Sequence, residues 1–304
     1  MEKASVVQRI KVDALMLLIA FIWGSAFTAQ QLAARSLGTF AIIGLRFLGA
    51  GLLLLLLFRF RIQLSKQAIW QSVGIGVLLF SASALQQVAL LVSTVGNAGF
   101  ITGMYVVFIP VFLSLFWRKR IWWNAWAAVV LVLTGLYLLT SSGGSQVTRG
   151  DVLLIGSSIL YAFQMIALSH VVRHSDPYQI AVVQFLACGL LGMGAAAFFE
   201  QNTLAGIQQA WQPMLFLTVL ATGVAFTLQG VAQKIAEPTD AAIFLSMESV
   251  FAALVGVIYL QESFTPWQMA GCGLMFAAMV LSQIEFQRKK DMLSGKFTPI
   301  EIIE

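Results

Sequence analysis

Hydrophobic runs of about twenty residues follow one another along almost the whole chain, and a run of this length can cross the apolar core of a bilayer as a helix. Only 10% of the 304 residues are charged, whereas soluble domains carry about a quarter. A lipid bilayer is therefore the first predicted partner. We place the spans at residues 12–32, 39–58, 69–91, 95–116, 121–140, 150–172, 177–199, 211–233, 238–260 and 264–285. The predicted fold class is an all-α membrane protein with ten transmembrane helices.

The basic residues between the spans are distributed unevenly over the two sides of the membrane. Fifteen of the 18 Lys and Arg residues fall on one side, Arg35 and Arg149 fall on the other, and Arg46 lies inside a span. Because cytoplasmic loops carry the excess of Lys and Arg, we expect both termini in the cytoplasm of a multi-pass protein of the inner cell membrane. The net charge of +5 then reflects topology, so no nucleic-acid partner is expected.

The chain repeats itself. A shift of 138 residues places Gly51 on Gly189, and a shift of 143 places Gln86 on Gln229 and Met104 on Met247. Spans one to five thus correspond to spans six to ten. Since five is an odd number, the second copy enters the membrane from the opposite side, and the two five-helix repeats are inverted. Inverted repeats are typical of secondary transporters, which expose one midplane site alternately to each side, so the predicted partner is a small-molecule substrate.

Three motifs carry a family resemblance, and the resemblance covers essentially the whole chain. They are Trp23-Gly24-Ser25-Ala26-Phe27, Leu45-Arg46-Phe47, and the segment from Ser93-Thr94-Val95-Gly96-Asn97 through to Ile109-Pro110. With these motifs the chain resembles the EamA-type family of the drug/metabolite transporter superfamily. The resemblance implies a central cavity formed by both halves, with the fifth and tenth spans at the periphery, and efflux of metabolites, amino acids or drugs. We divide the chain into repeat 1 (1–140), repeat 2 (150–286) and a cytoplasmic tail (287–304).

Two charged residues, Arg46 and Glu248, lie well inside apolar spans, where a charge is expensive and usually functional. Arg46 either binds an anionic group of the substrate, or forms a structural salt bridge or reaches toward the outer interface. Glu248, whose repeat equivalent is Tyr105, either binds a cation or exchanges a proton, or else locks helices together by hydrogen bonds. Protons are therefore a possible second partner.

Further candidates are aromatic and amide side chains within the spans. Aromatic walls with a few amide groups suit a zwitterionic or aromatic solute. For the amides, hydrogen bonding between helices is the structural alternative, and Asn97 also suits a helix cap. Pro110 lies inside the fourth span and is a candidate kink or gating hinge. With Arg46 and Glu248, the predicted substrate-binding set is completed by Trp23, Gln86, Gln87, Asn97, Tyr105, Tyr161, Gln164 and Gln229.

Motifs for other chemistry are missing from the sequence. It has no phosphate-binding loop and no serine-histidine-acid set, and its two histidines, His170 and His174, are too few for a histidine-rich metal site. No enzyme activity, cofactor or metal is expected. Three hypotheses follow. The first is an exporter of small metabolites such as amino acids or related zwitterions, driven by protons or by the solute's own gradient. The second is a multidrug exporter of lipophilic cations by proton antiport. A membrane enzyme or a non-transporting scaffold is the third.

Overall fold

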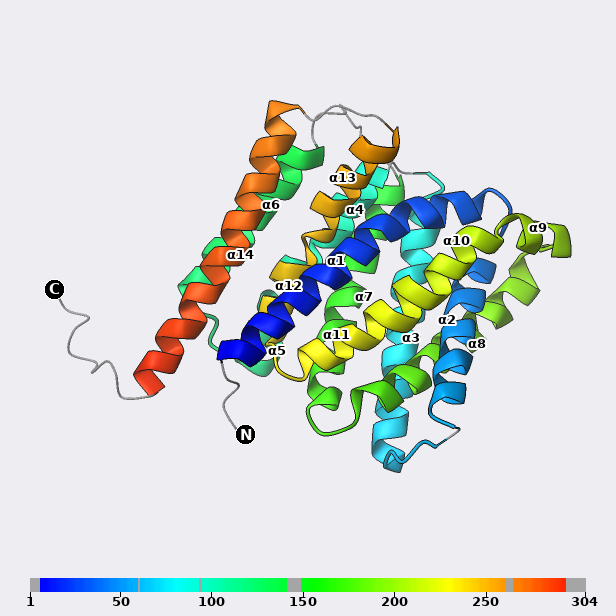
Figure 1. Ribbon diagram of the computed structural model, residues 1–304, viewed down its shortest axis with the longest axis horizontal. Helices are drawn as coiled ribbons and strands as arrows, with labels where there is room; N and C mark the ends of the chain where they lie inside the picture. The colour runs from blue at the N-terminus through cyan, green and yellow to red at the C-terminus, as the bar shows by residue number, and fades with distance from the viewer. Residues whose placement is uncertain (1–5, 60, 93–94, 141–148, 261–264, 294–304) are drawn as a thin grey trace.

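A computed structural model describes residues 6–59, 61–92, 95–140, 149–260 and 265–293, and within these ranges the chain forms helices and no strand (Figure 1). In chain order the elements are α1 (Val6–Ala34), α2 (Thr39–Leu57), α3 (Lys66–Ala89), α4 (Val95–Gly103), α5 (Tyr105–Trp117), α6 (Trp123–Thr140), α7 (Arg149–Val172), α8 (Pro177–Phe199), α9 (Leu204–Gln209), α10 (Trp211–Phe216), the π-helical segment η2 (Leu217–Val224), α11 (Ala225–Gln233), α12 (Pro238–Leu245), α13 (Glu248–Leu260) and α14 (Pro266–Leu293).

The described helices have the length and apolar surface of a multi-pass membrane protein. Seven stretches are long and apolar enough to cross a membrane, and three shorter apolar helices accompany them, Ile101–Trp117, Trp123–Leu138 and Pro266–Leu281. Large apolar side chains point outward, among them Leu57 at 67% exposure and Phe198 at 86%. Such surface suits lipid and not water, which agrees with the composition.

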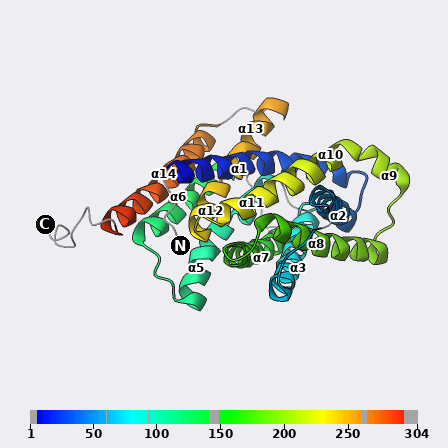
Figure 2. The ribbon, with the colours of Figure 1, turned by 60° about the horizontal axis from the view of Figure 1, so that its bottom comes forward.

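The first and second halves of the chain pack against each other. α2 lies along α8, α3 along α7, and α6 along α14 (Figures 1 and 2). Glycine allows the α2–α8 approach, since a Cβ on Gly44 would lie 2.7 Å from the backbone nitrogen of Met193, and one on Gly189 would clash with the backbone of Leu48. α6 and α14 lie together at one edge of the molecule (left in Figure 1), the place that the family resemblance implies for spans five and ten.

Two spans that we expected to be continuous are broken. The fourth span is divided at Met104 into α4 and α5, and the ninth at Ser246–Met247 into α12 and α13. The shift of 143 residues places Met104 on Met247, so the two breaks occupy equivalent positions of the repeat. The expected kink at Pro110 is not the site of the interruption, because this residue lies inside α5. Hydropathy averaged over a whole span does not detect such breaks, since the spans on both sides of Met104 and Met247 remain apolar on average.

Serine side chains bind backbone carbonyls beside both breaks. Ser158 Oγ donates to the Thr102 carbonyl at 3.0 Å, and Ser246 Oγ donates to the Ile243 carbonyl at 2.7 Å. An unsatisfied carbonyl in the apolar core is costly, so irregular backbone at membrane depth depends on such partners. The breaks are thus supported by neighbouring side chains.

Other boundaries also differ from the expected ones. The eighth span contains the π-helical segment η2, and a short helix, α9, precedes it where we expected a loop. Thr203 begins α9, with its Oγ1 accepting from the Gly206 N–H at 3.1 Å. α14 runs on to Leu293, so the predicted tail at 287–304 begins as part of this helix.

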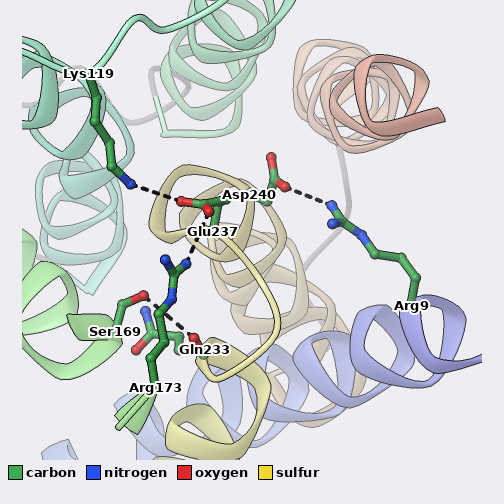
Figure 3. Close-up of polar contacts among 7 residues, drawn as sticks. All are labelled: Arg9, Lys119, Ser169, Arg173, Gln233, Glu237 and Asp240. Carbon is green, nitrogen blue, oxygen red and sulfur yellow. Dashed lines mark hydrogen bonds and ion pairs between the residues drawn. The ribbon is translucent and has the colours of Figure 1, made fainter. Parts of the chain in front are cut away.

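An ion-pair network joins segments that are distant in the sequence (Figure 3). Arg9 of α1 binds Asp240 of α12 at 2.7 Å. Glu237, which precedes α12, binds Lys119 after α5 at 3.2 Å and Arg173 after α7 at 3.1 Å. The predicted topology puts Arg9, Lys119 and Arg173 on the same side of the membrane, and in the structure these three residues lie near one another.

The Glu237 network predicts an acid-sensitive stability. Burial alone raises the pKa of Glu237, but Arg173 and Lys119 outweigh it and hold the pKa below the usual value of 4.5. A lowered pKa contributes stability that is complete above the unfolded value and is lost as the pH falls through the folded value. We expect Glu237→Gln to lower the Tm by roughly a few degrees at pH 7, since half-exposed pairs are weak. The Tm difference from wild type should shrink below pH 4.5; a constant difference down to pH 3.5 would contradict the assignment.

Candidate functional site

A cavity lies between the two halves of the chain. Its wall comes from α1 to α5 of the first half and from α7, η2, α11 and α13 of the second. It offers about 60 Å³ to the centres of water molecules, room for little more than a few of them. Eight of the ten predicted substrate-binding residues line it, namely Trp23, Arg46, Gln86, Tyr105, Tyr161, Gln164, Gln229 and Glu248.

The other two predicted residues are not placed at the cavity. Gln87 is 1% exposed and does not line it, and neither polar atom of its side chain has a hydrogen-bond partner within the described ranges. Gln86 and Gln87 are neighbours on α3, and consecutive helical residues point about 100° apart, so one face of the helix cannot present both. The side chain of Asn97 lies outside the part of the chain that the structure describes.

The two helix breaks position a pair of facing polar side chains. Tyr105 is the first residue of α5 and Glu248 is the first residue of α13, so the repeat equivalents both follow a break directly. The Tyr105 hydroxyl donates to Glu248 Oε1 at 3.4 Å. Glu248 is 5% exposed, and the N-terminus of a helix favours a carboxylate in its first turn. Together these features place a nearly buried acid on the cavity wall.

Arg46 brings the opposite charge to the same cavity. It is 5% exposed, and its guanidinium lies 4.6 Å from the ring centre of Phe47, which provides a cation–π contact. No carboxylate of the described residues lies within 4.0 Å of it, and its Nε has no hydrogen-bond partner. The structural salt bridge that we considered for Arg46 is therefore not formed with Glu248 or with any other described acid.

A chain of hydrogen bonds joins three helices at one wall of the cavity. Tyr161 Oη lies 3.1 Å from Ser83 Oγ and donates to Gln86 Oε1 at 3.3 Å, and Gln86 Nε2 donates to Thr102 Oγ1 at 3.3 Å. Gln86 thus forms hydrogen bonds between helices, which is the structural role that we considered for the amide side chains. Gln164 differs, because neither polar atom of its side chain has a hydrogen-bond partner among the residues that the structure describes.

Trp23 connects α1 to the π-helical segment. Its Nε1 donates to the Ala221 carbonyl at 3.0 Å, and its ring centre lies 4.6 Å from that of Phe226. The π-helical turn is wider than an α-helical one, and such turns often occur at functional sites. The indole therefore forms an ordered wall of the cavity.

Several lining residues escaped the sequence reading. Ala26, Phe27 and Gln30 follow Trp23 at spacings of three, four and seven residues. These are the spacings of one helical face, so a tryptophan at mid-span could have pointed to all three. The others, Thr102, Met165, Ala221 and Phe226, carry no comparable signal in the sequence.

Comparison with known proteins agrees with this architecture. Over 279 residues the chain is 32% identical to an uncharacterized transporter of Archaeoglobus fulgidus, covering 90% of this chain and 86% of that protein. It is 26% identical to the S-adenosylmethionine/S-adenosylhomocysteine transporter of Chlamydia muridarum, with 93% and 94% covered. It is 24% identical to the threonine/homoserine exporter RhtA of Escherichia coli, with 59% and 61% covered.

A protein of known crystal structure shares the fold, with a TM-score of 0.77 at 14% identity, over 91% of this chain and 98% of that one. The model of the EamA-like transporter family matches twice, at residues 10–141 and 148–283. These two matches cover both halves of the chain, in agreement with an architecture of two repeats. The chain therefore belongs to the EamA-like transporter family.

Proposed function

We propose that this protein is a secondary transporter that exports small zwitterionic metabolites, such as amino acids, by alternating access. The observation that carries the proposal is that Arg46 and Glu248 line the same cavity, where the described residues give Arg46 no acidic partner and Glu248 accepts from the neutral Tyr105 hydroxyl. A buried charge without a partner is unfavourable. The carboxylate of a zwitterion complements Arg46 with charge-assisted hydrogen bonds, and its ammonium group complements Glu248.

The names of the relatives support this substrate class. Threonine, homoserine, S-adenosylmethionine and S-adenosylhomocysteine, which name the cargo of two relatives, all carry an amino group and a carboxyl group on one carbon. They differ widely in the rest of the molecule. A site built on one cation and one anion recognises the part that they share, so the side chain of the amino acid is left to the aromatic and amide walls.

The small size of the cavity supports a movement of the two halves during transport. Ligand sites usually enclose about 300–1,000 Å³, much more than the roughly 60 Å³ found here, so we propose that the cavity widens to admit a substrate. We propose that the units 1–140 and 150–286 are inverted five-helix repeats, ten transmembrane helices in all, that rock about this site. The breaks at Met104 and Ser246–Met247 are suitable hinges.

The second candidate is a proton-coupled exporter of lipophilic cations. The observation that favours it is the set of aromatic side chains near the acid, Trp23, Tyr105, Tyr161 and Phe226, since aromatic faces attract organic cations. In that case Glu248 is the exchangeable acid. Arg46 counts against it, because an unneutralised guanidinium on the same wall repels a cation.

Transport into liposomes distinguishes the two candidates. Proteoliposomes preloaded with an unlabelled amino acid should take up the labelled one by counterflow, and tetraphenylphosphonium should neither be taken up nor compete. Protein-free liposomes provide the background. Uptake of tetraphenylphosphonium driven by a proton gradient, without amino-acid counterflow, would favour the second candidate. A protein that moves no solute under any gradient would revive the enzyme or scaffold hypothesis.

The inverted topology has its own test. Reporter domains fused after Ser141 and after Gln201 should be external, and those fused after Lys66 and after Arg120 cytoplasmic, because 15 basic residues are predicted on the cytoplasmic side. A cytoplasmic reporter at Ser141 would contradict both the inversion and the cytoplasmic position of the termini.

Trp23 should be needed for transport and not for insertion. Trp23→Ala removes the indole from the wall and should lower counterflow at least about tenfold, while Trp23→Phe, which keeps an aromatic ring but loses the bond to the Ala221 carbonyl and part of the ring surface, should lower it about fivefold. Trp70→Ala is the matched control, because this tryptophan is 74% exposed and lies outside the cavity. Yield in the membrane should match wild type for all three. Loss of insertion in Trp23→Ala would show a purely structural role.

A further inference from the structure

A second hollow lies between α3, α5 and α7 and shares no lining residue with the central cavity. It encloses about 450 Å³, within the range of about 300–1,000 Å³ that is usual for ligand sites. Its walls are largely apolar, with Ile75 and Leu78 from α3, Leu113 and Trp117 from α5, and Ile166 from α7. In a chain that spans a bilayer, walls of this kind suit an acyl chain.

The mouth of this groove is basic. Lys119 and Arg173 line it together with His170, and no carboxylate is among its described lining residues. Glu237 holds both cations at its edge, 3.2 Å from Lys119 and 3.1 Å from Arg173 (Figure 3). One carboxylate against two permanent cations leaves a net positive charge, and the buried Nε of Arg173 has no hydrogen-bond partner in the described part of the chain. The mouth therefore has the capacity to bind an anion.

The basic mouth and the apolar walls meet at the expected boundary of the membrane. Lys119 follows the end of α5 and Arg173 follows the end of α7. Trp117, which lines the groove, is 53% exposed, and tryptophan is enriched at the level of the lipid headgroups. An occupant must then have an anionic group at the headgroup level and an apolar body at the depth of the acyl chains.

We propose that this groove binds an anionic phospholipid, with the phosphate at Lys119 and Arg173 and an acyl chain along α3 and α5. Basic pockets between transmembrane helices bind anionic headgroups in this way. Glu237 keeps the two cations together at the mouth without neutralising both. The groove is a lipid site separate from the transport cavity, so it does not depend on which solute the protein carries.

Native mass spectrometry of the full-length protein tests the proposal. Phosphatidylglycerol and phosphatidylcholine with the same acyl chains are titrated in a mild detergent, and wild type should bind phosphatidylglycerol more tightly. Lys119→Gln should weaken phosphatidylglycerol binding about fivefold, the usual contribution of one basic residue near a lipid headgroup. Lys234→Gln, which removes an exposed charge outside the groove, should leave binding unchanged.

Glycine variants test the apolar part of the site. A Cβ on Gly74, which lines the groove, meets nothing within 4 Å, so Gly74→Leu should fill the groove without strain and weaken binding of both lipids. Gly194→Leu is the matched control, because the space around this α8 glycine is equally open and it lies outside the groove.

Two results would overturn the proposal. The first is that the variants Lys119→Gln and Gly74→Leu both bind phosphatidylglycerol as tightly as the wild-type protein does. The second is displacement of phosphatidylglycerol by inorganic phosphate at equal concentration, since a site that holds the phosphate alone is an anion site and not a lipid site.

Discussion

Arg46→Gln is expected to abolish zwitterion counterflow while the protein still folds and inserts. The charge-assisted bonds to a substrate carboxylate contribute about 1.5–3 kcal/mol, so their loss should weaken binding roughly 10- to 150-fold. Glutamine is a suitable replacement, because Gln184, the repeat equivalent of Arg46, is itself a buried glutamine at 1% exposure. Counterflow measures the first effect, and membrane yield with a monodisperse elution profile measures the second.

The Glu248→Gln variant completes this test. It should weaken zwitterion binding, because the contact to the substrate's ammonium group is lost, and it should change the pH dependence of flux, because glutamine cannot exchange a proton. If Arg46 and Glu248 formed a permanent pair, each single variant would leave a buried charge alone at a cost of about 3–5 kcal/mol. Both single variants would then express poorly, and the double variant Arg46→Gln, Glu248→Gln would recover. That pattern would contradict a site held open for substrate charges, as would cation efflux that survives in Arg46→Gln and vanishes in Glu248→Gln.

Gly24→Val is expected to reduce both stability and transport, because Gly24 is where α1 contacts α13. A Cβ at this position would lie 2.6 Å from the Glu248 carbonyl oxygen and 2.8 Å from the Ala252 nitrogen. Both are backbone atoms, so relief requires the two helices to separate, which also displaces Glu248 from the cavity. Overpacking of this kind costs about 1–3 kcal/mol, and we expect a Tm roughly 5 °C lower and little residual counterflow.

Gly194→Val is the matched control for this contact. A Cβ at this position has no described neighbouring atom within 4 Å, so the substitution should cause no clash. It should keep the Tm and the flux of wild type. Equal behaviour of the two variants would show that the close approach of α1 and α13 is not needed.

The sequence predicted the regular helices well because their ends carry local signals. The predicted span at 177–199 has the same bounds as α8, since Pro177 suits the first helical position and the Asp176 side chain accepts N–H bonds from Tyr178 and Gln179. The breaks at Met104 and Ser246–Met247 were not predicted. At the fourth span the partner comes from another helix, with Ser158 at the Thr102 carbonyl, and no pattern within that span reveals it. At the ninth span the partner is Ser246 of the same span, and a single serine is too common in membrane helices to predict a break.

The sequence predicted those residues of the candidate site whose side chains are energetically costly to expose to lipid. Arg46 and Glu248 stood out because a charge within an apolar span needs a cavity or a partner, and the structure places both on one cavity. Gln30 was missed because it lies two residues from the end of the predicted span at 12–32, where a polar side chain is unremarkable. Phe226 was missed because a phenylalanine facing a cavity looks like one facing lipid.

The most direct test of a site for opposite charges compares three related ligands that carry different charges. Binding of an amino acid, its methyl ester and its N-acetyl derivative to the purified protein is measured by isothermal titration calorimetry. The amino acid carries both charges, the ester only the positive one, and the N-acetyl derivative only the negative one. With Arg46 and Glu248 both engaged, the amino acid should bind at least about tenfold more tightly than either derivative. An ester that binds as tightly as the amino acid would contradict the role of Arg46 and the zwitterionic substrate class.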